Sequence, residues 1–272
     1  MSKQLSQEFT TISLDEAAQK APAILARNPH PRIKSPKYTF TNSVDVIEDL
    51  DRLGFKLTSA KQSKTSNPAM AEYGTHILRF GNPELYIKNS DGAIEARPEI
   101  VLINDHMGNR PVQFEAGLFR LVCSNGLVVK SQDFGGFRER HTRFDFEGLK
   151  RMIGEKVDGM KGIVEKISKW NGKLMSDAER FAFAAEAVAL RLANDRKPEN
   201  YELHEILTPK RTADEGKSLW KTFNIVQENL IKGGYQMNER QARAITNPIQ
   251  DIKINQDLWT LAEAYEIGRA HV

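Results

Sequence analysis

The sequence predicts an α+β fold, in which a mostly antiparallel sheet with a flanking helix precedes an all-helical C-terminal region. Three observations support this prediction. Short strand-like runs between about residues 55 and 130 are separated by turn residues instead of long crossover helices. Asn125-Gly126 interrupts the densest apolar run of the chain. From about residue 146 onward, apolar side chains recur at steps of three and four, as they do on one face of a helix.

The composition is that of an ordinary globular protein. With 272 residues, 40% hydrophobic and 28% charged, the chain can bury a sizeable core as one large domain or two small ones. We predict an N-terminal helix and arm at 1–37, an α+β sheet domain at 38–145 and a helical region at 146–272. A net charge of +3 permits a polyanionic partner without requiring one.

Composition also bears on the compartment. A single cysteine excludes an internal disulfide and a four-cysteine zinc site, and it suits a reducing environment. No apolar run approaches the roughly 20 residues that a membrane span needs. The N-terminus lacks the apolar core of a signal peptide. We therefore expect a cytoplasmic protein with no membrane partner.

The N-terminal segment is expected to hold a short helix and an arm. The capping-box sequence Ser13-Leu-Asp-Glu16 opens a helix over Asp15–Arg27. Asn28-Pro-His-Pro31 ends this helix, because proline cannot continue it. Residues 28–37 then form an extended basic arm, for which a solvated connector is favoured over a nucleic-acid-binding arm.

The sheet domain is expected to begin with one helix. Ser43 is the expected N-cap of a helix over Val44–Leu53, whose apolar residues fall at helical spacing. Turn residues such as glycine, asparagine and proline separate the strand-like segments that follow, which favours antiparallel neighbours. The expected strands are Phe55–Gln62, Thr75–Phe80, Glu84–Lys88 and Glu99–Asn104, with a polar loop over 63–71.

The central element of the predicted sheet is a hairpin. Asn-Gly is a strong hairpin signal, because both residues tolerate the positive φ that a type I′ turn needs. We therefore expect strands over Val112–Cys123 and Leu127–Lys130, joined by a tight turn at 124–126. The first strand has apolar residues at both its odd and its even positions, which point to opposite faces of the sheet. This pattern predicts a central strand covered on both faces. It also contains Glu115 and Arg120, and a buried charge needs a partner.

The sequence of the C-terminal half predicts helices along its whole length. Each expected helix carries one apolar stripe and most have recognisable ends, such as the capping box Ser176-Asp-Ala-Glu179. Trp220 and Trp259 are expected to anchor the packing between these helices. The expected helices are Glu147–Trp170, one from the Ser176 cap to Leu192, a short one from about Asn200, Ala213–Lys232, and Gln256–Ile267 with Asn255 as its cap.

Three segments resemble a known family. Arg120 followed by Cys123-Ser-Asn-Gly-Leu127 is one, Leu219-Trp220 through Gly234 is the second, and Asn255 through Ala262 is the third. The chain from about Tyr38 onward is similar to a family of uncharacterised phage- and plasmid-borne proteins, domain of unknown function 932. This resemblance implies a mobile genetic element as the context and no particular chemistry.

Candidate catalytic and metal-binding residues are few. Cys123 could act as a nucleophile with His106 or His141 as its base, but its apolar strand favours a buried small residue. His76, Asp105, His106 and His141 are suitable metal ligands without a diagnostic spacing. Neither a phosphate-binding loop nor a dinucleotide-binding glycine motif occurs. We expect no cofactor, no metal and no enzymatic activity.

A basic segment flanked by aromatic residues is the main candidate site. Arginines hold phosphates as bidentate donors, and a neighbouring aromatic ring can stack on an unpaired base. The acidic residues Glu139, Asp145 and Glu147 are interspersed, so a solvated loop with local ion pairs is about as well supported. The candidate nucleic-acid-binding residues are Arg120, Lys130, Phe137, Arg138, Arg140 and Arg143, with His141 and Phe144 beside them.

These observations favour a nucleic-acid-binding protein of a phage, plasmid or prophage, with single-stranded DNA binding or annealing as its function. The order of helix and strands resembles the cores of single-strand annealing proteins, which form rings, so a homo-oligomer is left open. The first alternative is a non-enzymatic protein that binds a host protein and modulates host defence or replication. The second is a hydrolase or nuclease that uses Asp105, His106 and Glu115.

Overall fold

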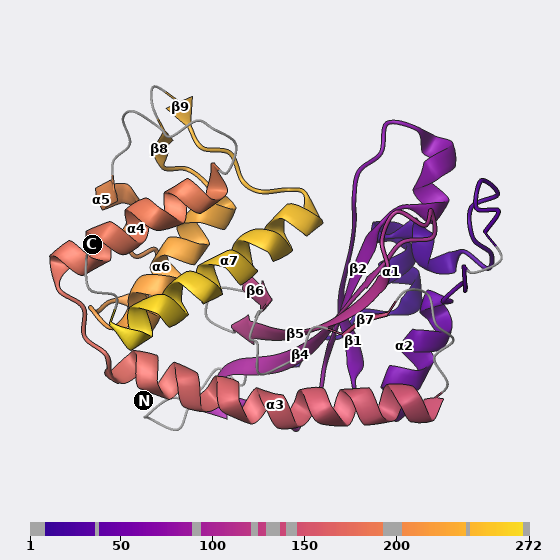
Figure 1. Cartoon of the computed structure of the whole chain (residues 1–272), viewed down its shortest axis with the longest axis horizontal. Helices are drawn as coiled ribbons and strands as arrows, with labels where there is room; N and C mark the ends of the chain where they lie inside the picture. The colour runs from indigo at the N-terminus through magenta and orange to yellow at the C-terminus, as the bar shows by residue number, and fades with distance from the viewer. Residues whose placement is uncertain are drawn as a thin grey trace. The chain divides into compact units, whose positions relative to one another are not determined.

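The computed structural model describes the chain except for residues 1–8, 36–37, 89–93, 121–124, 129–136, 140–145, 193–202, 238–239 and 269–272. The chain divides into two compact units, shown with their elements in Figure 1. Unit 1 comprises Met1–Gly126 and Phe134–Val157, and unit 2 comprises Leu127–Asp133 and Asp158–Val272. None of the helices in the described part of the chain combines the length and hydropathy that crossing a membrane requires.

Unit 1 is built on a seven-stranded sheet, in which the order is β1-β2-β4-β5-β6, with β3 on β4 and β7 on β5. The pairings described in register, from β1–β2 to β5–β7, are antiparallel. The mostly antiparallel sheet and its flanking helix α2 (Ser43–Arg52) are therefore confirmed. The strands are β1 Lys56–Gln62, β2 His76–Gly81, β3 Ile87–Lys88, β4 Ile94–Asn104, β5 Val112–Arg120, β6 Asn125–Val128 and β7 Phe137–Glu139.

One face of this sheet forms the core of unit 1. Leu102 of β4 lies opposite Leu78 of β2 and opposite Phe114 of β5, and all three are fully buried. Side chains on one face of neighbouring strands pack directly on each other, so this row stabilises the sheet. The alternate residues include the buried ion pair Arg79–Glu99, with 2.9 Å between Nη1 and Oε2.

Strand β5 has neighbours on both edges, as predicted, but its two faces differ. Phe114 and Leu118 are fully buried, whereas Glu115 and Phe119 on the other parity are half-buried. The second face is therefore covered less completely than the first. The positions of the apolar residues along the strand could not distinguish the two faces, because they do not show which neighbouring elements cover each face.

The Asn-Gly signal is displaced from its predicted role. Asn125 and Gly126 are the first two residues of strand β6, which pairs with β5. The predicted turn at 124–126 is therefore wrong in position, because strand pairing overrides a local turn preference. The predicted end of the first strand, residues 121–123, lies outside the described residues.

The N-terminal helix is shorter than predicted. Helix α1 (Leu14–Lys20) has the expected capping box, with Ser13 Oγ accepting from the Glu16 amide at 3.1 Å. A 3₁₀ turn, η1 (Pro22–Leu25), follows it, because Pro22 has no amide hydrogen to continue the α-helix. A second 3₁₀ segment, η2 (Pro68–Tyr73), occupies much of the predicted polar loop.

The basic arm after η1 contacts the connection between β4 and β5. The Arg32 guanidinium donates to the Met107 carbonyl at 3.1 Å and to Asn109 Oδ1 at 2.6 Å. The His30 amide donates to the His106 carbonyl at 2.9 Å. The arm is thus held against the sheet domain at Arg32 and His30.

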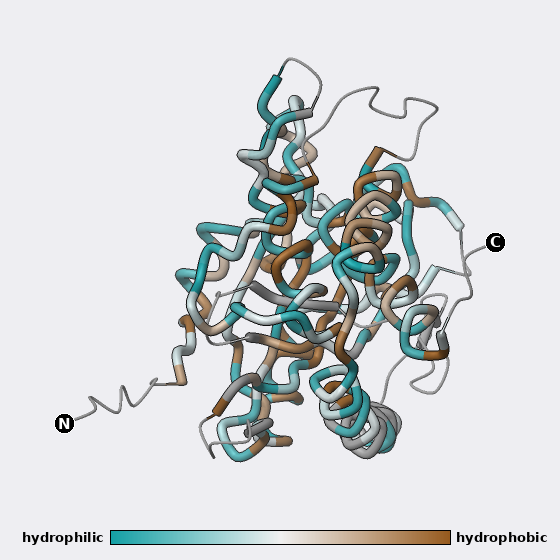
Figure 2. The backbone as a smooth tube through the Cα atoms, turned by 90° about the vertical axis from the view of Figure 1, so that its left-hand side faces the viewer, coloured by the Kyte–Doolittle hydropathy of each residue, from teal (hydrophilic) through white to brown (hydrophobic). Residues whose placement is uncertain are grey.

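In its described residues, unit 2 is mainly helical, with a small hairpin and the last two residues of β6. The hairpin pairs β8 (Gln236–Met237) with β9 (Arg240–Gln241). The helices are α4 Asp177–Arg191, α5 Leu203–Ile206, α6 Leu219–Lys232 and α7 Pro248–Ile267, with η4 at Thr212–Asp214, while α3 (Phe146–Gly172) contributes to both units. Helix α6 is buried on nearly all sides, from Thr222 to Leu230, and Figure 2 shows how apolar and polar residues are distributed along the backbone.

Two of the predicted helix starts in unit 2 are wrong. Helix α6 begins after Ser218, whose hydroxyl accepts from the Lys221 amide, and not at Ala213. Helix α7 begins after Asn247, whose side chain accepts from the Ile249 amide at 2.9 Å, eight residues before the predicted cap. Pro248 at the first helical position explains this start, because its fixed φ suits a first turn.

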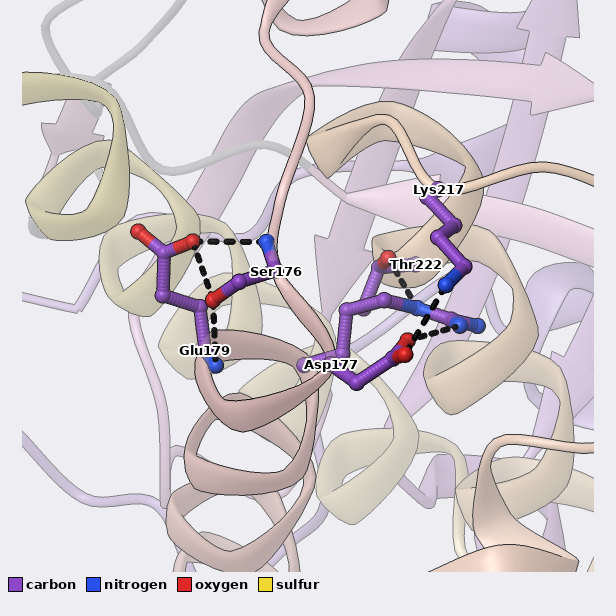
Figure 3. A network of polar contacts seen from close by, with 6 residues as sticks. Ser176, Asp177, Glu179, Lys217 and Thr222 are labelled. Atoms are coloured by element: carbon purple, nitrogen blue, oxygen red, sulfur yellow. Dashed lines mark hydrogen bonds and ion pairs between the residues drawn. The ribbon is translucent and has the colours of Figure 1, made fainter.

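The start of α4 is confirmed and is tied to α6. Ser176 Oγ accepts from the Glu179 amide at 3.2 Å, and the Glu179 carboxylate accepts from the Ser176 amide at 2.7 Å. Beside this cap, Asp177 pairs with Lys217 at 2.9 Å (Figure 3). Arg180 of the same helix donates to the Thr222 hydroxyl of α6 at 3.2 Å.

Aromatic rings form the core of unit 2, which confirms Trp220 and Trp259 as packing anchors. The rings of Trp170 and Trp259 lie 4.5 Å apart, and Trp220 is stacked on Phe223 at 5.6 Å. The indole nitrogen of Trp170 donates to Glu266 at 2.8 Å. The buried rings thus contribute apolar area to the core, and the indole N–H of Trp170 still has a hydrogen-bond partner.

Candidate functional site

The structure places three of the six candidate nucleic-acid-binding residues on adjoining strands. Phe137 and Arg138 are in β7, where they lie opposite Phe114 and Gln113 of β5. Arg120 is the last residue of β5. About six residues of strand separate the two positions on β5, or roughly 20 Å. Lys130, Arg140 and Arg143 lie outside the described residues.

A second polar site, not predicted, lies where α2 meets the ends of β2 and β4. Asn42 is the N-cap of α2, with its Oδ1 accepting from the Val44 amide at 2.9 Å, so the predicted cap at Ser43 is wrong. Ser43 instead has its hydroxyl oxygen 2.7 Å from His76 Nε2. Asn104 Nδ2 donates to Ser43 Oγ and to the Thr41 carbonyl, both at 3.0 Å.

The hydrogen bonds determine which nitrogen of His76 carries the proton. Nδ1 lies 3.0 Å from the Gly74 carbonyl, which can only accept, so Nδ1 is the donor. Nε2 then accepts from the Ser43 hydroxyl. Burial lowers the pKa of His76 to about 4, although the bond to Gly74 and the charge of Asp105 oppose this shift. His76 is therefore neutral at physiological pH.

A serine beside a neutral histidine is the pair that activates a nucleophile in many hydrolases. Here both side chains have 0% of their surface exposed, so no substrate can reach the hydroxyl. The third group, which orients the imidazole, is a backbone carbonyl and not a carboxylate. The arrangement thus joins α2 to two strands and has no access for catalysis.

Asp105 organises the turn that follows β4. Its Oδ2 accepts from the Thr75 hydroxyl at 2.6 Å, and its Oδ1 accepts from the amides of Met107 and Asn109 at 2.9 and 3.1 Å. The Tyr38 hydroxyl donates to the Asp105 carbonyl at 3.3 Å. Burial and the nearby carboxylate raise the pKa of Tyr38 to about 12, so this phenol remains protonated.

This geometry bears on the hydrolase alternative. The carboxylate of Asp105 is engaged by three donors, and the ring of His106 packs against Phe40 at 4.7 Å and His76 at 5.0 Å. Glu115 lies on β5 opposite Val101, four residues before Asp105. Over the described ranges, no three His, Cys, Asp or Glu side chains group closely enough to hold a metal ion. Cys123 and His141 lie outside those ranges.

Unit 2 has its own buried polar site on α6. Glu228 accepts two bonds from the Arg211 guanidinium, at 3.2 and 3.0 Å, and one from Lys232 at 2.6 Å. Burial of the carboxylate acts to raise its pKa, but the hydrogen bonds from Arg211 and Lys232 outweigh burial and lower the pKa of Glu228. Gln227 donates to Asn255 Oδ1 at 2.7 Å, so the predicted cap of α7 is instead an interhelical partner.

A cavity of about 280 Å³ also lies in unit 2, between the end of α4 and the first half of α7. Its walls are apolar at Leu190, Leu192, Ile245 and Ile254. Of its charged residues, Lys253 pairs with Asp257 at 2.6 Å, and Arg191 donates to the carbonyls of Leu230 and Arg243. Each of these charged groups thus has a partner within the unit.

The sequence signals for these buried sites were weak. Asn104-Asp105 follows an apolar strand, which suggests a polar strand end but names no partner. Ser43 lies beside a better-placed Asn42, and both residue types cap helices equally well. The partners come from segments 33 and 61 residues away from Ser43 in the chain, so local patterns could not identify them.

Comparison with known proteins finds relatives over most of the chain. The profile of the family described as "Domain of unknown function (DUF932)" matches residues 32–259. The UPF0380 protein YafZ of Escherichia coli K12 is 30% identical over 270 residues, which cover 93% of this chain and 91% of that protein. The UPF0380 protein YfjQ of the same organism is 29% identical over 269 residues, covering 93% and 90%. No solved structure matches the chain.

Proposed function

This chain belongs to the DUF932 family, and on that premise we propose that it is a non-enzymatic protein that binds single-stranded nucleic acid. We further propose that it acts in the cytoplasm and is carried by mobile genetic elements. One observation supports the binding proposal most directly. The basic segment starts in β7, with Arg138 opposite Gln113 of the central strand β5. Its first arginine is therefore part of a strand that the sheet holds in place.

The residue types of this segment suit single strands. Arg138, Arg140 and Arg143 can each present a planar, permanently charged donor group to a phosphate. Phe137 and Phe144 flank them, and an aromatic ring stacks on any unpaired base without regard to its identity. A duplex keeps its bases stacked inside, so such rings favour an unpaired strand.

Mobility shift with labelled single- and double-stranded oligonucleotides, repeated across salt concentrations, tests this function. We expect a shift for single strands that weakens as salt rises, because displaced counterions drive the association. Light scattering of the same samples shows whether binding is accompanied by a homo-oligomer. If the full chain shifts neither kind of strand even at about 50 mM salt, the proposal is wrong, since phosphate contacts are strongest at low salt. A host protein would then be the better candidate partner.

A further inference from the structure

We propose that unit 2 carries a phosphate-binding surface of its own, the Gly233 cluster, which contacts single-stranded nucleic acid. The cluster is defined as Arg191, Lys210, Arg211, Lys232, Arg240 and Arg243, whose chain segments meet near the C-terminal end of α6. This inference rests on the proposed function and adds a surface that the sequence did not indicate.

Gly233 brings the segments of the cluster together. It ends α6 with a φ of +70°, and a Cβ at this position would lie 2.4 Å from the Ala242 carbonyl oxygen and 2.7 Å from the Arg243 carbonyl carbon. The Gly234 amide donates to that same Ala242 carbonyl at 2.8 Å. The chain around Arg243 therefore packs directly on the end of the helix, a contact that glycine alone permits.

Further cations reach this point from other parts of unit 2. Lys210 Nζ lies 3.3 Å from the Gly233 carbonyl, and Lys232 precedes Gly233 in the chain. Arg191 of α4 donates to the carbonyls of Leu230 and Arg243, and its guanidinium lies 5.5 Å from the centre of the Tyr235 ring. Segments that are far apart in sequence thus present like charges at one place.

The carboxylates that bond within this region are turned away from solvent. Only 4% of the Glu228 side chain is exposed, while it accepts from Arg211 and Lys232. Glu205 is half-buried and accepts from the Gln236 amide at 2.8 Å. In contrast, Lys210, Lys232, Arg240 and Arg243 are exposed. The charge presented to solvent by these residues is therefore positive, which suits a phosphate backbone.

Helix capping explains only part of the cluster. Cations are stabilised at the C-terminus of a helix by its dipole, and the bonds of Lys210 and Arg191 to the last carbonyls of α6 fit that role. Arg240 is in β9, and Arg243 follows that strand, so neither belongs to the helix end. These two exposed arginines therefore provide the test of the proposal.

The test compares two double variants of the full chain with the same loss of charge. Arg240→Ala with Arg243→Ala removes the two arginines, and Lys169→Ala with Lys217→Ala removes two exposed cations elsewhere in unit 2. Fluorescence anisotropy with a labelled single strand is measured over a salt series. We expect the arginine variant to flatten the slope of log K against log salt by about 1.4, at about 0.7 per phosphate contact. The lysine variant should keep the wild-type slope.

The outcomes separate this inference from the proposed function. If the wild type binds and the arginine variant keeps its slope, the Gly233 cluster is not a binding surface, while the proposed function stands. If both double variants flatten the slope equally, the effect is one of net charge and the inference is again overturned. If the wild type binds no strand, both proposals fail. Unchanged thermal melting of the arginine variant shows that any lost binding is not a lost fold.

Discussion

The hydroxyl of Ser43 donates to Nε2 of His76 across 2.7 Å, and both side chains are fully buried in unit 1. The same hydroxyl accepts from Asn104, so the first turn of α2 is bonded to the start of β2 and the end of β4. Buried polar groups of this kind stabilise a fold only while every partner is satisfied. The bond therefore leads to two predictions about stability.

Removal of the Ser43 hydroxyl should destabilise the protein more than loss of a surface cap. Ser43→Ala leaves His76 Nε2 and one Asn104 proton without their partner, which costs about 1–3 kcal/mol of unfolding free energy. Asn42→Ala, the matched control, removes only the true N-cap and should cost about 1 kcal/mol. Urea unfolding measures both values. An unchanged midpoint for Ser43→Ala would show that the network does not contribute to stability.

The depressed pKa of His76 predicts a loss of stability in mild acid. The pKa falls from an ordinary 6.5 to about 4 on folding, so between these values the unfolded chain binds more protons than the folded one. The part of the unfolding free energy that depends on neutral His76 is fully present above pH 6.5. It is lost as the pH falls toward 4, by about 3 kcal/mol in all. Urea unfolding of wild type and His76→Gln across this range provides the measurement. Parallel pH profiles for the two proteins would contradict the prediction.

Two adjacent glycines at the end of α6 should respond differently to alanine. Gly233→Ala places a Cβ against the Ala242 backbone at 2.4 Å, so the chain must shift, and we expect a loss above about 2 kcal/mol. Gly234 has a φ of +92° but no atom within 4 Å of its Cβ position, so Gly234→Ala should cost only the backbone strain of about 1–2 kcal/mol. Thermal melting compares them. Equal losses would show that the close approach to Ala242 is not required.

The arginines of the basic segment should control the salt dependence of binding. Changing Arg138, Arg140 and Arg143 together to alanine should flatten the slope of log K against log salt by about 2, weakening binding alike for all base sequences. Phe137→Ala should instead cost roughly 1–3 kcal/mol of binding free energy with the slope unchanged, since stacking releases no counterions. Anisotropy titrations supply both quantities. A slope that is unchanged in the triple variant would remove these arginines from the site.

Local patterns sufficed wherever neighbours in the chain decide the structure. The capping box at Ser176 lies within one helical turn, and the apolar strand around Phe114 combined with turn residues was enough to predict the antiparallel sheet. The sequence also pointed to the basic segment as a candidate site, and the register places Arg138 of β7 opposite Gln113 of β5. Periodicity and turn chemistry carry this information because they act over a few residues.

Tertiary structure decided which of several equivalent roles each polar residue takes. Asparagine and serine can cap a helix or join a buried network, and Ser43 and Asn255 were predicted as caps. Their partners, His76 and Gln227, lie 33 and 28 residues away, so only the folded chain brings them within reach. The Gly233 cluster arises in the same way, from segments that meet at one glycine. By itself the sequence determined the class of fold, because periodicity and turn chemistry act over a few residues, while packing between distant segments determined the partners of the buried polar side chains.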